Sequence, residues 1–120
     1  MNPDNYCTLS AAKRLHEAGI VIETEAWWAR RVLGNADRWE LTHNKSISLA
    51  VEVLPAPCMA EVWWELPETI QCTRKKRQLH FEKWRGESYA SYENYGLAKN
   101  INPTDALIDL KIWTVKEKKS

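Results

Sequence analysis

The segment RQLHFEKWRGESYASYEN, residues 77–94, decides the fold class of this chain. Apolar and polar side chains alternate along two arms, and Arg85-Gly86 lies between the arms, so the segment predicts an antiparallel hairpin with a two-residue turn. That turn sets Phe81 opposite Ala90. One face of the hairpin is then apolar and comprises Leu79, Phe81, Ala90 and Tyr92. The other face, which a one-sided sheet leaves in solvent, carries His80, Glu82, Trp84, Tyr89 and Ser91.

An earlier stretch rich in Thr, Trp, Val and Leu surrounds Gly34-Asn35, a pair suited to a tight hairpin turn. This turn sets Arg30 opposite Trp39. Trp28 then lies opposite Leu41. We expect one side of this pleat to point into the core, namely Trp28, Arg30, Val32, Trp39 and Leu41. The other side carries Trp27, Arg31, Arg38 and Glu40.

Three helices complete the pattern. The first is expected over residues 9–18, with Thr8 as its N-terminal cap and Gly19 as its left-handed stop. The second is expected to begin with Pro57 and to end at Pro67. Its apolar stripe consists of Met59, Val62, Trp63 and Leu66.

The third helix has the clearest signature and spans about residues 103–117. Asn102 is its predicted cap and Pro103 its first helical residue. Its broad apolar stripe suits either deep packing on a sheet or a subunit interface. Before the second helix, residues 44–54 alternate like a strand, although a loop with one short strand also fits.

The resulting order is α-β-β-(β)-α-β-β-α, which predicts an α+β domain. We expect an antiparallel sheet of two hairpins, with about four to five strands, packed by three helices. Length and composition support one globular domain over residues 1–120, because 44% of the residues are hydrophobic and 28% are charged.

Charge and cysteine usage narrow the function classes. A formal net charge of +1 makes binding to bulk nucleic acid unexpected. No apolar run approaches the ~18 residues of a membrane span, so no membrane association is expected. Three cysteines without a CxxC pair favour neither a disulfide framework nor a zinc site, and they fit a reducing cytoplasm.

No sequence motif indicates catalysis. GxGxxG, P-loop, HExxH and GxSxG patterns are missing, and the three histidines, His16, His43 and His80, lie far apart in the chain. Two carboxylate pairs at helical spacing, Glu61 with Glu65 and Asp105 with Asp109, have no accompanying histidine, which favours exposed acidic faces. We therefore expect no enzyme, no metal and no cofactor.

Indole side chains are the unusual feature, since the chain has 7 Trp and 4 Tyr but 1 Phe. Periodicity turns Trp28, Trp39, Trp63 and Trp113 inward, whereas Trp27 and Trp64 are intermediate. Trp84 and Tyr89 face outward, as a stacking platform or an interface requires. The basic run from Arg74 to Arg77 is either a solvated turn or a phosphate contact. The candidate ligand-binding or partner-binding residues are Trp84, Tyr89, His80, Arg74, Lys75, Arg77 and Arg85.

Five segments, CTL (7–9), AAKRL (11–15), APCMAE (56–61), ELP (65–67) and NPTDAL (102–107), resemble a group of small uncharacterised accessory proteins of bacteriophages and prophages. The resemblance implies a mobile-element accessory protein and carries over no catalytic residues. It favours a non-enzymatic binding protein that sequesters a nucleotide-type immune signal as a counter-defence. The alternatives are an inhibitor or assembly component that binds a host or phage protein, and an enzyme with a convergent site.

A deep pocket with aromatic and basic walls would favour the nucleotide, and a flat aromatic patch would favour a protein partner. The breadth of the third helix's stripe and the outward indoles also predict a homo-oligomer.

Overall fold

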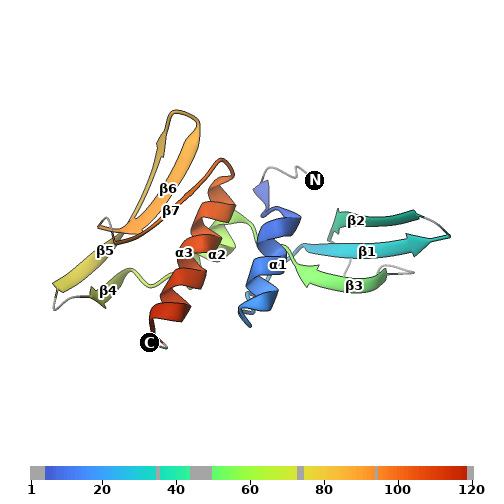
Figure 1. Ribbon diagram of the computed structural model, residues 1–120, viewed down its shortest axis with the longest axis horizontal. Helices are drawn as coiled ribbons and strands as arrows, with labels where there is room; N and C mark the ends of the chain where they lie inside the picture. Colours follow the sequence, from blue (N-terminus) through green and yellow to red (C-terminus); the bar gives the residue numbers. More distant parts are fainter. Residues whose placement is uncertain (1–4, 35, 44–49, 73–74, 94, 119–120) are drawn as a thin grey trace.

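The computed structural model describes residues 5–34, 36–43, 50–72, 75–93 and 95–118 of the chain (Figure 1). It confirms an α+β fold with three helices and antiparallel strands. In chain order the elements are α1 (Leu9–Glu17), β1 (Trp27–Leu33), β2 (Ala36–Thr42), β3 (Ala50–Pro55), α2 (Met59–Glu65), β4 (Thr69–Cys72), β5 (Lys75–Trp84), β6 (Glu87–Tyr92), β7 (Tyr95–Asn100) and α3 (Pro103–Lys118).

The strands form two sheets instead of the single sheet expected from the sequence. One sheet has the order β2-β1-β3 and the other has the order β4-β5-β6-β7. The three helices lie between them, as Figure 1 shows. The two predicted hairpins do not pair with each other, because each hairpin completes its own sheet with neighbouring strands. Short β4 and β7, which were not predicted, extend the second hairpin on either side.

Both predicted hairpin registers are confirmed. Arg30 pairs with Trp39 in the first hairpin, and Leu33 pairs with Ala36 across the turn; Asn35 itself lies outside the described residues. In the second hairpin Phe81 pairs with Ala90, as a two-residue turn requires. The remaining predicted pairs are also present, namely Trp28 with Leu41 and Leu79 with Tyr92.

The predicted N-terminal caps of α1 and α3 are confirmed, and the predicted start of α2 is corrected. Thr8 Oγ1 accepts the Ala11 N–H at 3.2 Å, and Asn102 Oδ1 accepts the Asp105 N–H at 3.1 Å. Helix α2 begins after Cys58, not with Pro57, because a reciprocal capping box forms there. The second half of that box is the Cys58 N–H, which donates to the Glu61 side chain at 2.8 Å.

The core lies where α3 meets α1, α2 and the second sheet. Leu107, Ile108 and Leu110 are fully buried, so the broad stripe of α3 serves deep packing. Tyr92 is also fully buried; its ring stacks on Trp113 at 6.4 Å, and its hydroxyl donates to the Pro67 carbonyl oxygen at 2.7 Å. Burial raises the pKa of Tyr92 to about 12.

The two carboxylates of α3 are structural, which corrects the prediction of an exposed acidic face there, whereas Glu65 of α2 is exposed as predicted. Asp105 is only 3% exposed, and it accepts the Thr8 N–H at 2.9 Å and the Thr8 hydroxyl at 2.6 Å. One turn later, Asp109 pairs with Arg14 at 2.9 Å. These contacts join α3 to α1. They were not predicted because the partners lie more than ninety residues apart in sequence.

The orientation of several side chains also differs from the prediction. Val32 is 41% exposed, because the outer end of the first sheet projects away from the helices that form the core. Trp63 was expected in the core and is 40% exposed. Ser91 was expected outside and is buried, at the point where the pairing of β6 with β7 becomes irregular.

The molecule is elongated, with principal extents of 55 × 33 × 22 Å. Its radius of gyration is 15.7 Å, compared with about 13.6 Å for a compact chain of this length. Its accessible surface is 7775 Å², compared with about 6,700 Å² for a typical monomer of this mass. The elongated molecule therefore keeps more surface in solvent than a compact chain of the same mass. No helix in the described ranges is long and apolar enough to cross a membrane.

Candidate functional site

The outer face of the second sheet carries the aromatic residues predicted to bind. This outer face comprises His80, Glu82, Trp84, Glu87, Tyr89, Leu97 and Lys99, which alternation and strand register place on one side of β5, β6 and β7. Trp84 is 61% exposed and Leu97 is 60% exposed, whereas Tyr89 is half-buried. Helix α3 packs on the opposite side, where Ala90 and Ala98 are buried.

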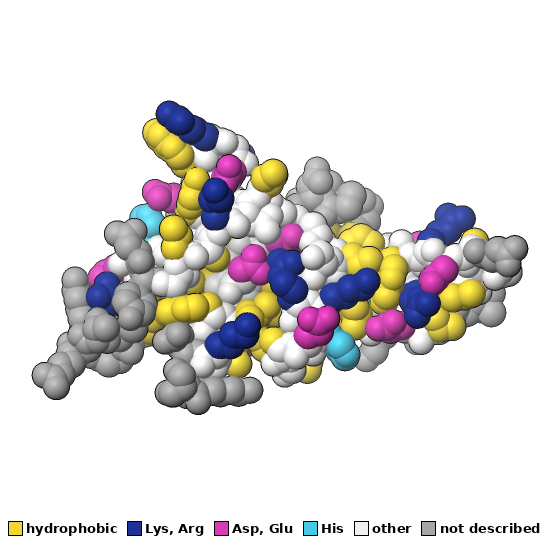
Figure 2. All heavy atoms as spheres, viewed as in Figure 1, with side chains coloured by type: hydrophobic (Ala, Val, Ile, Leu, Met, Phe, Trp, Pro, Cys, Tyr) yellow, Lys and Arg dark blue, Asp and Glu magenta, His cyan; other side chains and the backbone are white. Residues whose placement is uncertain are grey.

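Charges on the outer face are balanced in sign. Lys99 Nζ lies 3.3 Å from Glu87 Oε2, and His80 Nε2 lies 3.5 Å from Glu82 Oε2. The Arg85 guanidinium lies 5.5 Å from the Trp84 ring centroid, within the range of a cation–π contact. Figure 2 likewise shows basic and acidic side chains interspersed over the visible surface, with no large area of one sign.

The structure brings together only part of the predicted site. Trp84, Tyr89 and His80 share the outer face, with Arg85 at the adjoining turn. Arg77 lies on the other side of β5, together with Leu79, and its Nη1 donates to the Glu93 carbonyl oxygen at 3.3 Å. Arg74 lies outside the described residues, and so does the side chain of Lys75.

The separation of Arg77 from Trp84 was available in the sequence. Side chains alternate along a strand, so odd-numbered and even-numbered residues of β5 point to opposite sides. A stacking ring at Trp84 and a phosphate contact at Arg77 therefore cannot serve one small ligand on the same face.

A second aromatic surface lies between α2 and β5 and was missed by the sequence reasoning. It is a groove of about 420 Å³ lined by Trp63, Trp64, Leu66, Glu68, Gln78 and Leu79. Trp63 meets Phe81 edge-on at 6.4 Å, and Trp64 is 84% exposed. Its sequence signal was the pair of adjacent indoles in one short helix, because consecutive helical positions point about 100° apart and only one can face the core.

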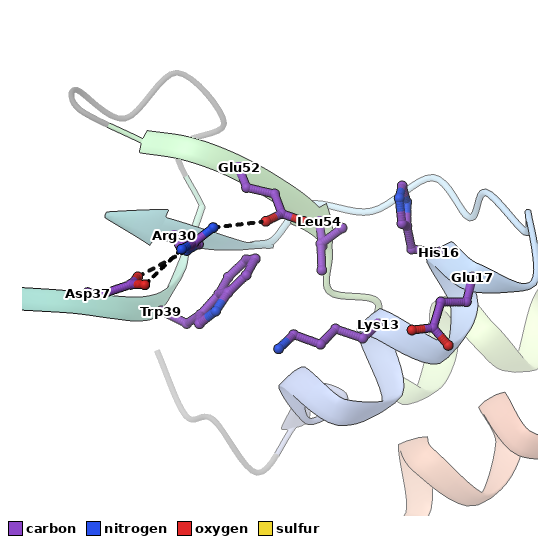
Figure 3. A pocket seen from close by; sticks show the side chains of 8 residues that line it. All are labelled: Lys13, His16, Glu17, Arg30, Asp37, Trp39, Glu52 and Leu54. Atoms are coloured by element: carbon purple, nitrogen blue, oxygen red, sulfur yellow. Dashed lines mark hydrogen bonds and ion pairs between the residues drawn. The ribbon is translucent and has the colours of Figure 1, made fainter. Parts of the chain in front are cut away.

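A further hollow lies between α1 and the first sheet (Figure 3). This pocket of about 460 Å³ is lined by Lys13, His16, Glu17, Arg30, Asp37, Trp39, Glu52 and Leu54. Arg30 donates to Asp37 at 3.0 and 2.8 Å and lies 3.8 Å from Glu52, while Lys13 Nζ lies 5.3 Å from the Trp39 ring. The Arg30 guanidinium lowers the pKa of Asp37 through that hydrogen-bonded pair. The arginine is thus occupied by carboxylates and not available as an anion site.

The described residues do not assemble a metal site. No group of three or more His, Cys, Asp or Glu side chains among them is arranged to hold a metal ion. Burial is the main cause that raises the pKa of Cys7 to about 12, so this thiol stays protonated at neutral pH. His43 lies apart from the other histidines, with Nδ1 at 2.9 Å from the Glu25 carbonyl oxygen.

In comparisons with known proteins, no family model, no curated protein and no solved structure matches this chain. The resemblance to phage and prophage proteins therefore stays a prediction from the sequence segments.

Proposed function

We propose that this protein is a non-enzymatic binding protein that attaches to a partner protein through the outer face of its second sheet. The observation that carries the proposal is the exposure of Trp84 and Leu97 on the same hydrogen-bonded face as Tyr89. Large apolar side chains grouped on a surface are typical of protein interfaces. Trp and Tyr are also the residue types that most often dominate binding energy at such interfaces.

The polar groups around this surface fit a protein partner better than a nucleotide. A nucleotide needs a stacking ring and uncompensated positive charge on the same side. Here Lys99 and His80 each lie beside a carboxylate, and Arg77 is on the opposite side of β5. The remaining cation, Arg85, lies over the Trp84 ring itself, on the surface that a base would need for stacking. The register instead sets Tyr89 at the centre of the outer face and Trp84 and Leu97 at opposite corners, with charged side chains of both signs between them. A surface that mixes aromatic, apolar and balanced charged groups is usual for a protein interface.

The partner expected from this chemistry presents an apolar patch to Trp84 and Leu97, with acidic and basic side chains at its edge. In agreement with the phage resemblance, we propose a host or phage protein in the bacterial cytoplasm. The protein would act by occupying that partner as an inhibitor or assembly component, and no bond is made or broken.

A photo-crosslinking amino acid at position 97, introduced into the protein in bacterial cells, tests the location of the interface. The matched control carries it at position 51, because Val51 is 63% exposed on the other sheet. We expect one discrete crosslinked protein from position 97, identified by mass spectrometry, and none of the same mass from position 51. Equal products from both positions, or none from position 97, would contradict the proposal.

Titration with ATP and with a cyclic dinucleotide separates the two ligand classes. The proposal expects no saturable change in tryptophan fluorescence with either nucleotide. A saturable change that Trp84→Ala abolishes, with folding intact by circular dichroism, would assign the outer face to a nucleotide instead.

A further inference from the structure

Strand β2 is an edge of the first sheet, which has the order β2-β1-β3. In the described parts of the chain, no strand pairs with its outer side. β2 spans Ala36–Thr42, contains no proline, and extends away from the helices (Figure 1). An uncovered edge strand of this kind presents backbone N–H and C=O groups that another strand can bind.

The charges on one side of β2 are incompletely paired within the protein. Arg38 lies directly opposite Arg31 of β1, so two like charges face each other. Glu40 forms an ion pair with Arg31, in which its Oε2 lies 3.2 Å from the Arg31 Nη1. Arg38 is exposed and has no carboxylate partner among the residues that the structure describes. A second carboxylate opposite Arg38 would therefore be stabilising.

We propose that a second copy of this chain supplies that carboxylate by pairing its own β2 antiparallel to the first. Trp39 is the midpoint of the strand, and a twofold axis there pairs all seven residues. Arg38 then lies opposite Glu40 of the second copy, and Glu40 lies opposite its Arg38. The two Trp39 rings become a cross-strand aromatic pair at the centre.

The neighbouring registers oppose identical charges. Residues directly opposite each other in an antiparallel pair point to the same face of the sheet, and a twofold axis keeps that face on the same side in both copies. The axis must therefore run midway between the two copies of one residue, and not between two successive residues. An axis at position 38 sets Arg38 against itself, and an axis at position 40 does the same for Glu40. The charge pattern thus selects the register centred on Trp39, which joins two three-stranded sheets into one of six strands. The outer face of the second sheet stays free in both copies.

Charge-reversal variants test this dimer. Sedimentation equilibrium measures their dimerisation from micromolar to near-millimolar protein concentration. Arg38→Glu sets like charges opposite each other twice in the proposed register, and Glu40→Arg does the same with the opposite sign. Each variant alone should dimerise at least about tenfold more weakly than the unaltered protein. The control Lys83→Glu changes an exposed charge on the other sheet and should leave dimerisation unchanged.

Mixing the two variants gives the decisive result. The mixture opposes carboxylates with guanidinium groups throughout, so a heterodimer should form with about the affinity of the unaltered dimer. Circular dichroism of each variant checks folding, and restored association in the mixture itself requires folded strands. A monomer at all concentrations, a dimer that Arg38→Glu leaves intact, or a mixture that stays monomeric would each overturn the proposal.

Discussion

Asp105→Ala should remove the strongest polar connection between the two ends of the chain. Asp105 is 3% exposed and accepts two hydrogen bonds from Thr8, at 2.9 Å from the backbone N–H and 2.6 Å from the hydroxyl. Hydrogen bonds to a charged group contribute about 1.5–3 kcal/mol each. Thr8 is exposed, so water can rehydrate its groups after the substitution. We therefore expect a loss of about 3 kcal/mol in the free energy of unfolding.

Urea unfolding followed by circular dichroism measures this loss. Asp109→Ala is the matched control, because it lies one turn further along α3 and its 2.9 Å pair with Arg14 is about one-third exposed. A partly exposed ion pair contributes at most about 1 kcal/mol. Asp105→Asn keeps the shape of the side chain and loses the charge, so its loss should fall between the two. Equal losses for Asp105→Ala and Asp109→Ala would refute the assignment of Asp105 as the stronger of the two connections between α1 and α3.

Two further predictions concern the packing around Trp113. Gly96 has a φ of +68°, and a Cβ there would lie 2.5 Å from the Trp113 ring, so Gly96→Ala should lower the free energy of unfolding in urea by about 2–4 kcal/mol. The control Gly86→Ala, with a φ of +78° and open space around it, should lower that free energy by only about 1–2 kcal/mol. Equal losses for the two variants would contradict the clash with Trp113. Tyr92→Phe removes the hydrogen bond to Pro67 and should cost about 1 kcal/mol at neutral pH. Because the pKa of Tyr92 rises from 10.0 to about 12 on folding, the associated stability is complete below pH 10 and declines as the pH approaches 12. The unaltered protein should therefore lose its advantage over Tyr92→Phe within that interval and become the less stable of the two, and a constant difference would contradict the burial of a neutral hydroxyl.

Local features of the fold could be predicted from the sequence. Two-residue turns at Gly34-Asn35 and Arg85-Gly86 fix their registers through short-range geometry, and the observed pairing agrees with both. Side-chain caps act within three residues, so Thr8 and Asn102 were predicted correctly as well.

Long-range features could not be predicted in the same way. The division into two sheets depends on which strands find one another across the helices, and turn chemistry carries no information about that choice. Asp105 has the sequence context of an ordinary first-turn acid, and its burial depends on Thr8 at the other end of the chain. For the same reason, an apolar stripe predicted that Trp63 faces the core, whereas its ring lies on the wall of a groove beside Phe81.

The candidate site was predicted in part, for a physical reason. Trp84 and Tyr89 were placed correctly on one face because strand alternation is local. The same alternation separates Arg77 from them. The charge balance on the outer face depends on Lys99 of β7, a strand that the sequence pattern did not predict.

The affinity of the crosslinked partner protein, once purified, for two tryptophan variants tests the outer face most directly. Trp84→Ala removes the 61% exposed ring at the turn end of the proposed interface, and Trp64→Ala removes an 84% exposed ring on α2. With both variants folded, isothermal titration calorimetry should show binding weakened by about 10–100-fold for Trp84→Ala and changed by less than about twofold for Trp64→Ala. Unchanged affinity for Trp84→Ala, or an equal loss for both variants, would contradict the outer face as the binding surface.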